Sequence, residues 1–133
     1  MELPYLKQDC LLTLREGLAI YYSIDPSYKE NTKLAPAFYN HDIVHVLFGL
    51  DTSVVNESLT DTRCIFATNW GLKKYISDYL KDPQAKKIIK VIFKDIGYFK
   101  GILFSISSIP KVIRTFFDCK RMNKKWEINP SNE

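Results

Sequence analysis

The chain has two histidines, His41 and His45, which lie four residues apart. On a helix this spacing puts both imidazoles on one face, with Cβ atoms about 5–6 Å apart, so that both can reach one metal ion. Asp42 follows the first histidine, and Glu57 follows the second after an eleven-residue spacer. Imidazole and carboxylate donors together suit Zn²⁺, Fe²⁺ or Mn²⁺. The pattern therefore predicts a metal site in this part of the chain.

Apolar residues surround the motif, at Ile43–Val44 and again at Val46–Phe48. Ionisable side chains in such a setting are costly unless they pair with one another or bind a cation. A structural interpretation stands beside the metal site. In it, Asp42 is an N-cap whose carboxylate accepts hydrogen bonds from the first N–H groups of a helix over residues 43–50, and His41 is a loop residue.

Apolar residues recur at helical spacing along most of the chain, and no run alternates for long enough to indicate a strand. The predicted helices are about 9–22, 41–50, 54–80, 83–99 and 101–122, with a short helix or loop at 25–34. Gly71 is a weak point within helix 54–80, and Pro110 interrupts the last helix. Helix 83–99 has an apolar stripe opposite a row of lysines. This stripe consists of Ile88, Ile89, Ile92, Phe93 and Ile96.

Three short segments carry helix-start signals. Asp25-Pro26 and Asp82-Pro83 each combine an N-cap residue with proline at the first helical position. Asp51-Thr52-Ser53 offers three consecutive candidates for an N-cap. These signals predict helices that begin directly after residues 25, 53 and 82.

A chain of 133 residues is about the size of one domain. Its composition is 46% hydrophobic and 14% aromatic, which excludes an intrinsically disordered protein. Neither the glycine-rich dinucleotide fingerprint nor a P-loop is present in the sequence. The predicted fold class is all-α, a compact single-domain helical bundle over residues 1–133.

The three cysteines, Cys10, Cys64 and Cys119, match no metal or redox spacing. Their odd number indicates reduced thiols and a reducing compartment. No basic segment followed by an apolar one is visible at the N-terminus. The expected location is cytoplasmic, peripheral at the inner face of a membrane. A pairing of Cys64 with His45 for nucleophilic catalysis stays open, although no spacing supports it.

The net charge of +4 is unevenly distributed along the chain. Residues 1–80 hold 7 Lys/Arg against 10 Asp/Glu, whereas residues 81–125 hold 12 against 3. Such a basic segment can meet phosphate groups of lipids or nucleic acid, or it can be a solvated face. No helix-turn-helix, zinc-finger or RNP motif is evident, so nucleic acid is the least favoured partner. Charges within the apolar window 98–117 argue against a membrane-spanning helix, whereas a helix lying in a membrane interface stays open.

The segment His41-Asp-Ile-Val-His45, followed after eleven residues by Glu57, resembles the HDxxH-x11-E signature of the coenzyme Q (ubiquinone) biosynthesis protein 4 family. The resemblance is strong over residues 11–60 and faint from 61 to 125. The family commonly has glycine immediately before the glutamate, where this chain has Asn56. Further segments are similar to bacterial members of the family. These segments are Leu14-Arg15-Glu16, Tyr21-Tyr22, His45–Gly49, Asp51-Thr52-Ser53 and Lys125-Trp126-Glu127.

The resemblance implies an all-α fold and metal ligands at His41, Asp42, His45 and Glu57. Zinc is the usual assignment, with Fe²⁺ or Mn²⁺ as alternatives. Members of the family associate peripherally with membranes and bind polyprenyl lipids near the metal. They organise the ubiquinone-biosynthesis complex and have been assigned removal of the C1 carboxylate from the polyprenyl-hydroxybenzoate ring, coupled to oxidation. Asp42 or Glu57 would be a ligand or the proton-transfer group.

Two hypotheses follow for the function. The first is a metal-dependent enzyme, a decarboxylase (lyase) of a prenylated aromatic acid. The alternative is a polyprenyl-lipid-binding scaffold of a quinone-biosynthesis complex, or a homodimer, whose metal only holds structure. The walls of a groove for the lipid tail would be Phe93, Phe99, Ile102, Leu103, Phe104 and Ile106, with ordinary core as the competing interpretation. The contacts to anionic head groups would come from Lys86, Lys87, Lys90, Lys111, Arg114, Lys120 and Arg121.

Overall fold

Two consecutive helices, α3 (Ala37–Leu47) and α4 (Val54–Phe66), pack against each other at the centre of the fold. The computed structural model describes residues 3–7 and 9–127, without some side chains near the end of α6 and the start of α7, among them Ile92, Ile96 and Phe104. Because α3 carries both histidines and α4 carries Glu57, this pair of helices positions the predicted site.

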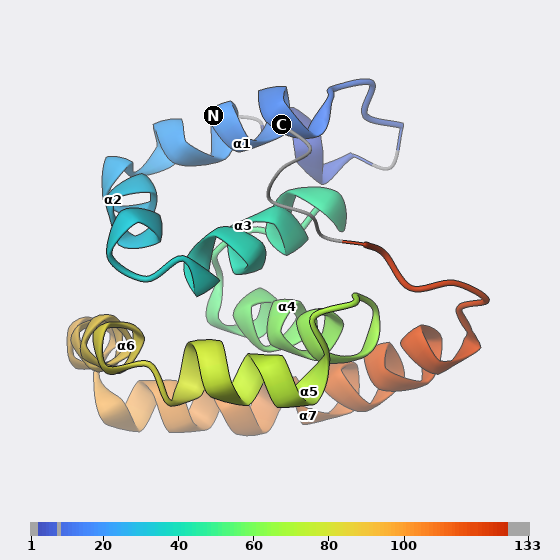
Figure 1. Cartoon of the computed structure of the whole chain (residues 1–133). Helices are drawn as coiled ribbons and strands as arrows, with labels where there is room; N and C mark the ends of the chain where they lie inside the picture. Colours follow the sequence, from blue (N-terminus) through green and yellow to red (C-terminus); the bar gives the residue numbers. More distant parts are fainter. Residues whose placement is uncertain (1–2, 8, 128–133) are drawn as a thin grey trace.

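The remaining helices cover the central pair from both sides (Figure 1). On one side, α1 packs on α3, and on the other, the long helix α7 runs along α4. Among the described residues the chain order is η1 (Pro4–Leu6), α1 (Leu14–Ile24), α2 (Pro26–Leu34), α3, α4, α5 (Gly71–Lys74), the π-helical segment η2 (Tyr75–Leu80), α6 (Pro83–Ile96) and α7 (Tyr98–Arg121).

The described part of the chain confirms the predicted all-α fold class. Its extended pairing is limited to an isolated bridge between Thr68 and Trp126. There, the Trp126 N–H donates to Ala67 O, and the Asn69 N–H donates to Trp126 O. This bridge ties the segment after α7 to the loop after α4.

The predicted helix starts are confirmed at all three capping segments. The Asp25 carboxylate accepts from Ser27 N at 2.8 Å, and the Asp82 carboxylate accepts from Ala85 N at 2.7 Å, each with proline at the first helical position. Of the three candidates before α4, Ser53 is the N-cap. The segment 25–34, predicted to be a short helix or loop, is helix α2.

Two predicted helix starts are wrong. The first helix begins at Leu14 instead of about residue 9, because Thr13 and Glu16 form a reciprocal capping box. Helix α3 begins at Ala37 after Pro36, about four residues earlier than predicted, and ends at Leu47. Asp42 is therefore an interior helical residue, and its interpretation as an N-cap is wrong.

Two other helix boundaries also differ from the predictions. The segment 54–80 is not one helix, because α4 ends at Phe66 and the Thr68 hydroxyl then bonds Cys64 O and Trp70 N. Gly71, at φ +69°, opens the short helix α5. Conversely, α7 continues through Pro110. Packing of buried Ser108, Thr115 and Cys119 along α4 offsets the local cost of proline.

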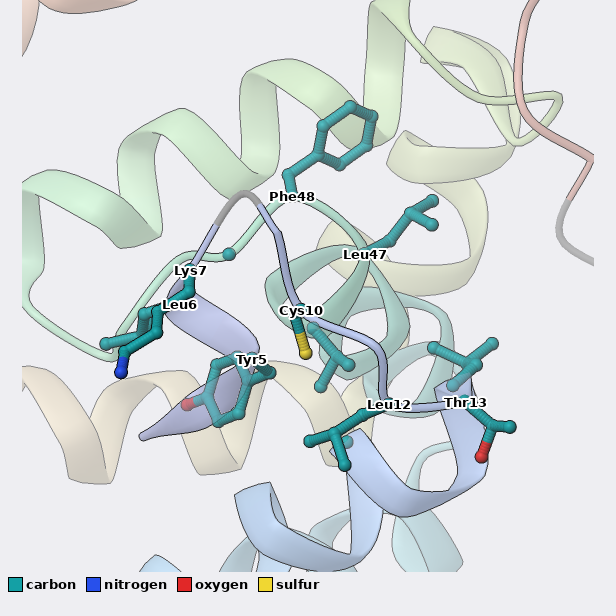
Figure 2. Close-up of a pocket in the computed structure, with 12 residues that line it drawn as sticks. Tyr5, Leu6, Lys7, Cys10, Leu12, Thr13, Leu47 and Phe48 are labelled. Carbon is teal, nitrogen blue, oxygen red and sulfur yellow. The ribbon is translucent and has the colours of Figure 1, made fainter. Parts of the chain in front are cut away.

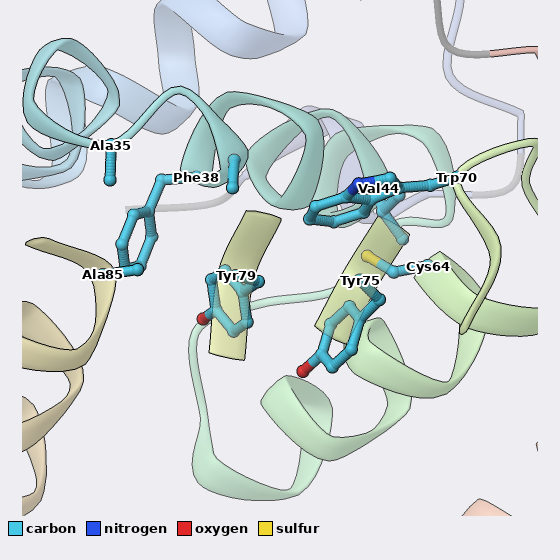
Figure 3. Packing of buried hydrophobic residues seen from close by; sticks show 9 residues of the cluster. Ala35, Phe38, Val44, Cys64, Trp70, Tyr75, Tyr79 and Ala85 are labelled. Carbon is cyan, nitrogen blue, oxygen red and sulfur yellow. The ribbon is translucent and has the colours of Figure 1, made fainter. Parts of the chain in front are cut away.

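Two apolar clusters enclose α3 from opposite sides. One joins α3 to η1 and α1 through Tyr5, Leu18, Tyr21, Ile43 and Val46. The other gathers aromatic and small residues from α3, α4, the segment 70–80 and the start of α6, as Figure 3 shows. This second cluster consists of Ala35, Ala37, Phe38, Val44, Cys64, Trp70, Tyr75, Tyr79 and Ala85. Helix α3 is consequently the most enclosed element of the site.

The predicted stripe on α6 is confirmed only in part. Ile88 and Ile89 pack against the second cluster, whereas Phe93 is 40% exposed. The side chains of Ile92 and Ile96 lie outside the described residues. In the described part of the chain, every helix is too short or too polar to cross a membrane.

Candidate metal centre

The two histidines lie side by side on the buried face of α3. His41 is 4% exposed and His45 is fully buried, and their ring centroids are 4.8 Å apart. Each ring also stacks on a tyrosine. Tyr79 of η2 lies 5.5 Å from His41 at an interplanar angle of 10°, and Tyr21 of α1 lies 5.5 Å from His45 at 29°. These aromatic contacts fix the planes of both imidazoles.

Glu57 reaches both histidines from the first turns of α4. Its Oε1 lies 3.3 Å from His45 Nε2, and its Oε2 lies 3.6 Å from His41 Nε2. Ligand atoms of the three residues all lie within 4.8 Å of one another, so His41, His45 and Glu57 could hold one metal ion. Two imidazole nitrogens and one carboxylate form the donor set of several catalytic zinc and non-haem iron sites.

Asn56 does not prevent Glu57 from reaching the histidines. No residue other than glycine has a positive φ in the described chain, so Asn56 has an ordinary helical backbone. Its side-chain amide donates to Asp51 Oδ1 at 2.8 Å, which adds to the capping of the first turn of α4. This turn is further fixed by the Ser53 cap, and Glu57 lies one residue beyond Asn56.

His45 is oriented by contacts on its other nitrogen. Nδ1 lies 3.3 Å from Leu50 O and 3.3 Å from Thr60 Oγ1. With Nδ1–H donating to the Leu50 carbonyl, Nε2 carries the lone pair and faces Glu57. This Nε2 is buried and forms no aligned hydrogen bond within the described structure. A buried nitrogen of this kind is a ready metal ligand.

His41 has a different environment, which includes a carboxylate that the sequence motif did not single out. Its Nε2 lies 3.2 Å from Asp61 Oδ1, closer than to Glu57. Burial lowers the pKa of His41, but the hydrogen bond to Asp61 and the charges of Glu57, Asp61 and Asp42 outweigh it and raise the pKa to about 9. Asp61 could have been found by its spacing, because it follows Glu57 by four residues, as His45 follows His41.

The carboxylates form the accessible side of the site. The side chains of Glu57 and Asp61 are 39% and 38% exposed, whereas the histidines lie beneath them. For Glu57, burial raises the pKa, but the close approach of the His45 and His41 imidazoles lowers it below its ordinary value. Glu57 is consequently ionised at neutral pH, as a metal ligand must be.

Asp42, like Asp61, lies outside the group formed by His41, His45 and Glu57. Its side chain is 4% exposed and interacts with the hydroxyls of Tyr21 and Tyr22 on α1. Burial raises its pKa to about 7, against the lowering effects of His41 and these hydroxyls. One of its oxygens, Oδ2, is buried without a hydrogen bond in the described structure. Its role as a ligand or proton-transfer group stays a prediction.

The structure also gives the environments of the candidate nucleophile Cys64 and of the residues predicted to form a groove for a lipid tail. Cys64 is fully buried, and this burial raises its pKa well above the ordinary value, which disfavours the thiolate that a nucleophile needs. The predicted groove residues Phe93, Phe99, Ile102, Leu103 and Ile106 are between 40% and 74% exposed, so they are not ordinary core. The Phe104 side chain lies outside the described residues.

A separate hollow lies beside the N-terminal segment (Figure 2). It has a volume of about 400 Å³ and lies among the N-terminal segment, the start of α1 and the end of α3, with Cys10, Leu12 and Leu47 among its lining residues. Neither the histidines nor Glu57 lines it.

Comparisons with known proteins complete the description of the site. No family model, curated protein or solved structure matches the chain. The case for a metal site therefore rests on the geometry of His41, His45 and Glu57 alone.

Proposed function

We propose that this protein is a divalent-metal protein of quinone-type lipid metabolism, which acts on or binds polyprenylated aromatic acids as in ubiquinone biosynthesis. The observation that carries the metal part is the convergence of His41 Nε2, His45 Nε2 and the Glu57 carboxylate within 4.8 Å. The substrate class rests on the resemblance of the HDxxH-x11-E residues to the coenzyme Q biosynthesis protein 4 family. Zn²⁺ is the first candidate ion, with Fe²⁺ or Mn²⁺ as alternatives.

The arrangement supports a reaction at an acidic oxygen of the substrate. A bound divalent ion would supply Lewis-acid stabilisation of negative charge on a carboxylate or phenolate. The exposed side of Glu57 is the direction from which such an oxygen can approach. His41 and His45 hold their positions through stacking on Tyr79 and Tyr21. The activity proposed is oxidative decarboxylation at ring C1, in which CO₂ leaves, a hydroxyl group from water takes its place, and dioxygen accepts the two electrons and is reduced to hydrogen peroxide.

The lipid tail would pack against exposed apolar side chains of α6 and α7. Phe99, Ile102 and Ile106 are each more than half exposed. The segment 81–125, which contains them, also has an excess of lysines and arginines that can meet anionic head groups, each for about 1 kcal/mol near a membrane surface. A peripheral membrane surface is the partner that this combination of apolar and basic side chains fits best.

The second candidate function is a lipid-binding scaffold whose metal holds structure without catalysis. The observation that favours it is the position of the group between α3 and α4, because an ion there would tie the two central helices together. A quinone-biosynthesis complex or a second copy of the chain would then be the partner.

A turnover experiment separates the two functions. Metal-loaded protein is incubated in air with a prenylated 4-hydroxybenzoate, and CO₂ release and ligand binding are both measured. The enzyme hypothesis predicts CO₂ release that is lost in Glu57→Gln and retained in Glu30→Gln, an exposed glutamate remote from the site in the chain. Binding without CO₂ release in the loaded wild type would favour the scaffold, and neither binding nor release would contradict both.

A further inference from the structure

The strongest unassigned feature of the molecule is a second carboxylate at the candidate metal centre. Asp61 follows Glu57 by one helical turn on α4, just as His45 follows His41 on α3. Two i, i+4 pairs thus face each other across the interface between the two central helices. Asp61 Oδ1 lies 3.2 Å from His41 Nε2, whereas Glu57 Oε2 lies 3.6 Å from the same nitrogen.

Two independent observations indicate that this cluster is built to hold an ion. The first is His45, which is fully buried and whose Nε2 faces Glu57 without an aligned hydrogen bond in the described structure. The second is a contact that orients the carboxylate of Asp61. The hydroxyl of Tyr75, a buried residue at the start of η2, interacts with the Asp61 carboxylate. Second-shell partners of this kind orient the ligands of metal sites.

We propose that Asp61 is the second carboxylate ligand of the metal, so that the donor set is His41, His45, Glu57 and Asp61. This inference rests on the proposed metal site and extends it. Asp42, which the motif puts in the ligand set, instead interacts with the tyrosines of α1. Two carboxylates neutralise a divalent ion, and both are more than a third exposed, which leaves room for a substrate oxygen. Oxygen-rich sets of this kind favour Fe²⁺ or Mn²⁺ more than a three-donor His₂Glu set does.

The first test compares the affinities of matched asparagine variants for Zn²⁺ and Mn²⁺, measured by chelator competition on the full chain. The amide oxygen that Asp61→Asn introduces still accepts a hydrogen bond from His41, but the side chain lacks the negative charge of a ligand. We expect Asp61→Asn to weaken binding by at least about 100-fold, the upper end of what the loss of a second-shell partner costs. The matched control is Asp118→Asn, at an exposed position of α7, which should change the affinity by less than about threefold.

The second test detects the ligand directly and does not depend on the stability of the asparagine variant. In Asp61→Cys, a thiolate replaces the carboxylate, and Co²⁺ is added in place of the native metal. A cobalt–thiolate charge-transfer band is expected in Asp61→Cys, and no such band is expected in Asp42→Cys.

The outcomes distinguish this inference from the proposed function. If the wild type binds neither Zn²⁺ nor Mn²⁺, the metal site itself is wrong. If the wild type binds metal but Asp61→Asn binds as tightly and Asp61→Cys shows no cobalt–thiolate band, the metal site stands and the role of Asp61 is wrong. A cobalt–thiolate band in Asp42→Cys would overturn the exclusion of Asp42 from the ligand set.

Discussion

At the scale of single residues, the two histidines of one helix face differ in what holds them. His45 is oriented by a carbonyl, Leu50 O, and by Thr60 Oγ1, whereas His41 is paired with the carboxylate of Asp61. Acidic neighbours around His41 keep it protonated at neutral pH in the metal-free protein, with a pKa of about 9. A metal ion would have to displace this proton, so its binding would depend on pH.

The raised pKa of His41 predicts that the stability of the metal-free protein depends on pH. A group whose pKa rises from 6.5 to about 9 on folding stabilises the folded state below pH 6.5, and this stabilisation is lost as the pH rises through about 9. In the presence of a chelator, we expect His41→Gln to be less stable than the wild type by ~3 kcal/mol near pH 6. This difference should shrink towards pH 10.

The measurement is urea unfolding of both proteins at several pH values. The window begins above pH 5 because Glu57, whose pKa is lowered on folding, contributes stability that is lost as the pH falls through acidic values. A difference between wild type and His41→Gln that stays constant from pH 6 to pH 10 would contradict the assignment of charge to His41.

At the scale of helices, the site depends on how closely α1 approaches α3. A Cβ atom on Gly17 would clash with Val46 Cγ1, so this glycine permits the contact that brings Tyr21 onto His45. Alanine favours an isolated helix by up to about 1 kcal/mol relative to glycine. The clash opposes this gain, because overpacking typically costs about 1–3 kcal/mol.

We therefore expect Gly17→Ala to lower the free energy of unfolding by about 1–2 kcal/mol. Ser23→Ala, at an exposed position of the same helix, should change it by less than about 0.5 kcal/mol. Denaturant unfolding of the two variants measures the difference. An increase in stability in Gly17→Ala would show that α1 and α3 can separate without cost.

The helices also show which parts of the fold the sequence could predict. Cap residues and prolines are local signals, and Asp25-Pro26, Ser53 and Asp82-Pro83 are therefore where the prediction put them. The early start of α3 depends on Pro36 and on burial between two clusters, which no short window of sequence reveals. The continuation of α7 through Pro110 depends on packing against α4, which is a tertiary effect.

The same distinction applies to the candidate site. His41 and His45 were predicted together because helical spacing alone brings them together. The resemblance to the HDxxH-x11-E signature singles out Glu57, and the packing of α3 on α4 brings it to the histidines. The partner of His41, Asp61, and the stacking tyrosine Tyr79 come from other elements, and only the three-dimensional fold shows their contact. Asp42 is adjacent to His41 in sequence but faces α1, because successive helical residues point about 100° apart.

At the scale of the whole molecule, many of the exposed apolar side chains lie on α6 and α7. Phe99 is 74% exposed and Ile106 is 57% exposed, on the segment that also has the excess of lysine and arginine. Contiguous apolar surface rimmed by polar residues marks interaction sites in soluble folds. Under the proposed function, these side chains would meet a membrane surface with anionic lipids.

This assignment predicts the behaviour of a double variant, Phe99→Ser with Ile106→Ser. Because each buried apolar side chain contributes about 1.5–3 kcal/mol, the double variant should lose most binding to anionic vesicles in a flotation assay. The matched control is Leu11→Ser, which removes a 98% exposed leucine far from α7 in the chain and should leave flotation unchanged. Equal flotation of the double variant and the wild type would show that another surface, or none, meets the lipid.

The most direct test of the central claim is the metal content per chain, measured by elemental mass spectrometry on protein purified without a histidine tag. His45→Ala removes the buried imidazole whose Nε2 faces Glu57. We expect about one equivalent of metal in the wild type and its loss in His45→Ala. The absence of metal from both proteins, even after addition of Zn²⁺, Fe²⁺ or Mn²⁺, would contradict the metal centre and with it the proposed function.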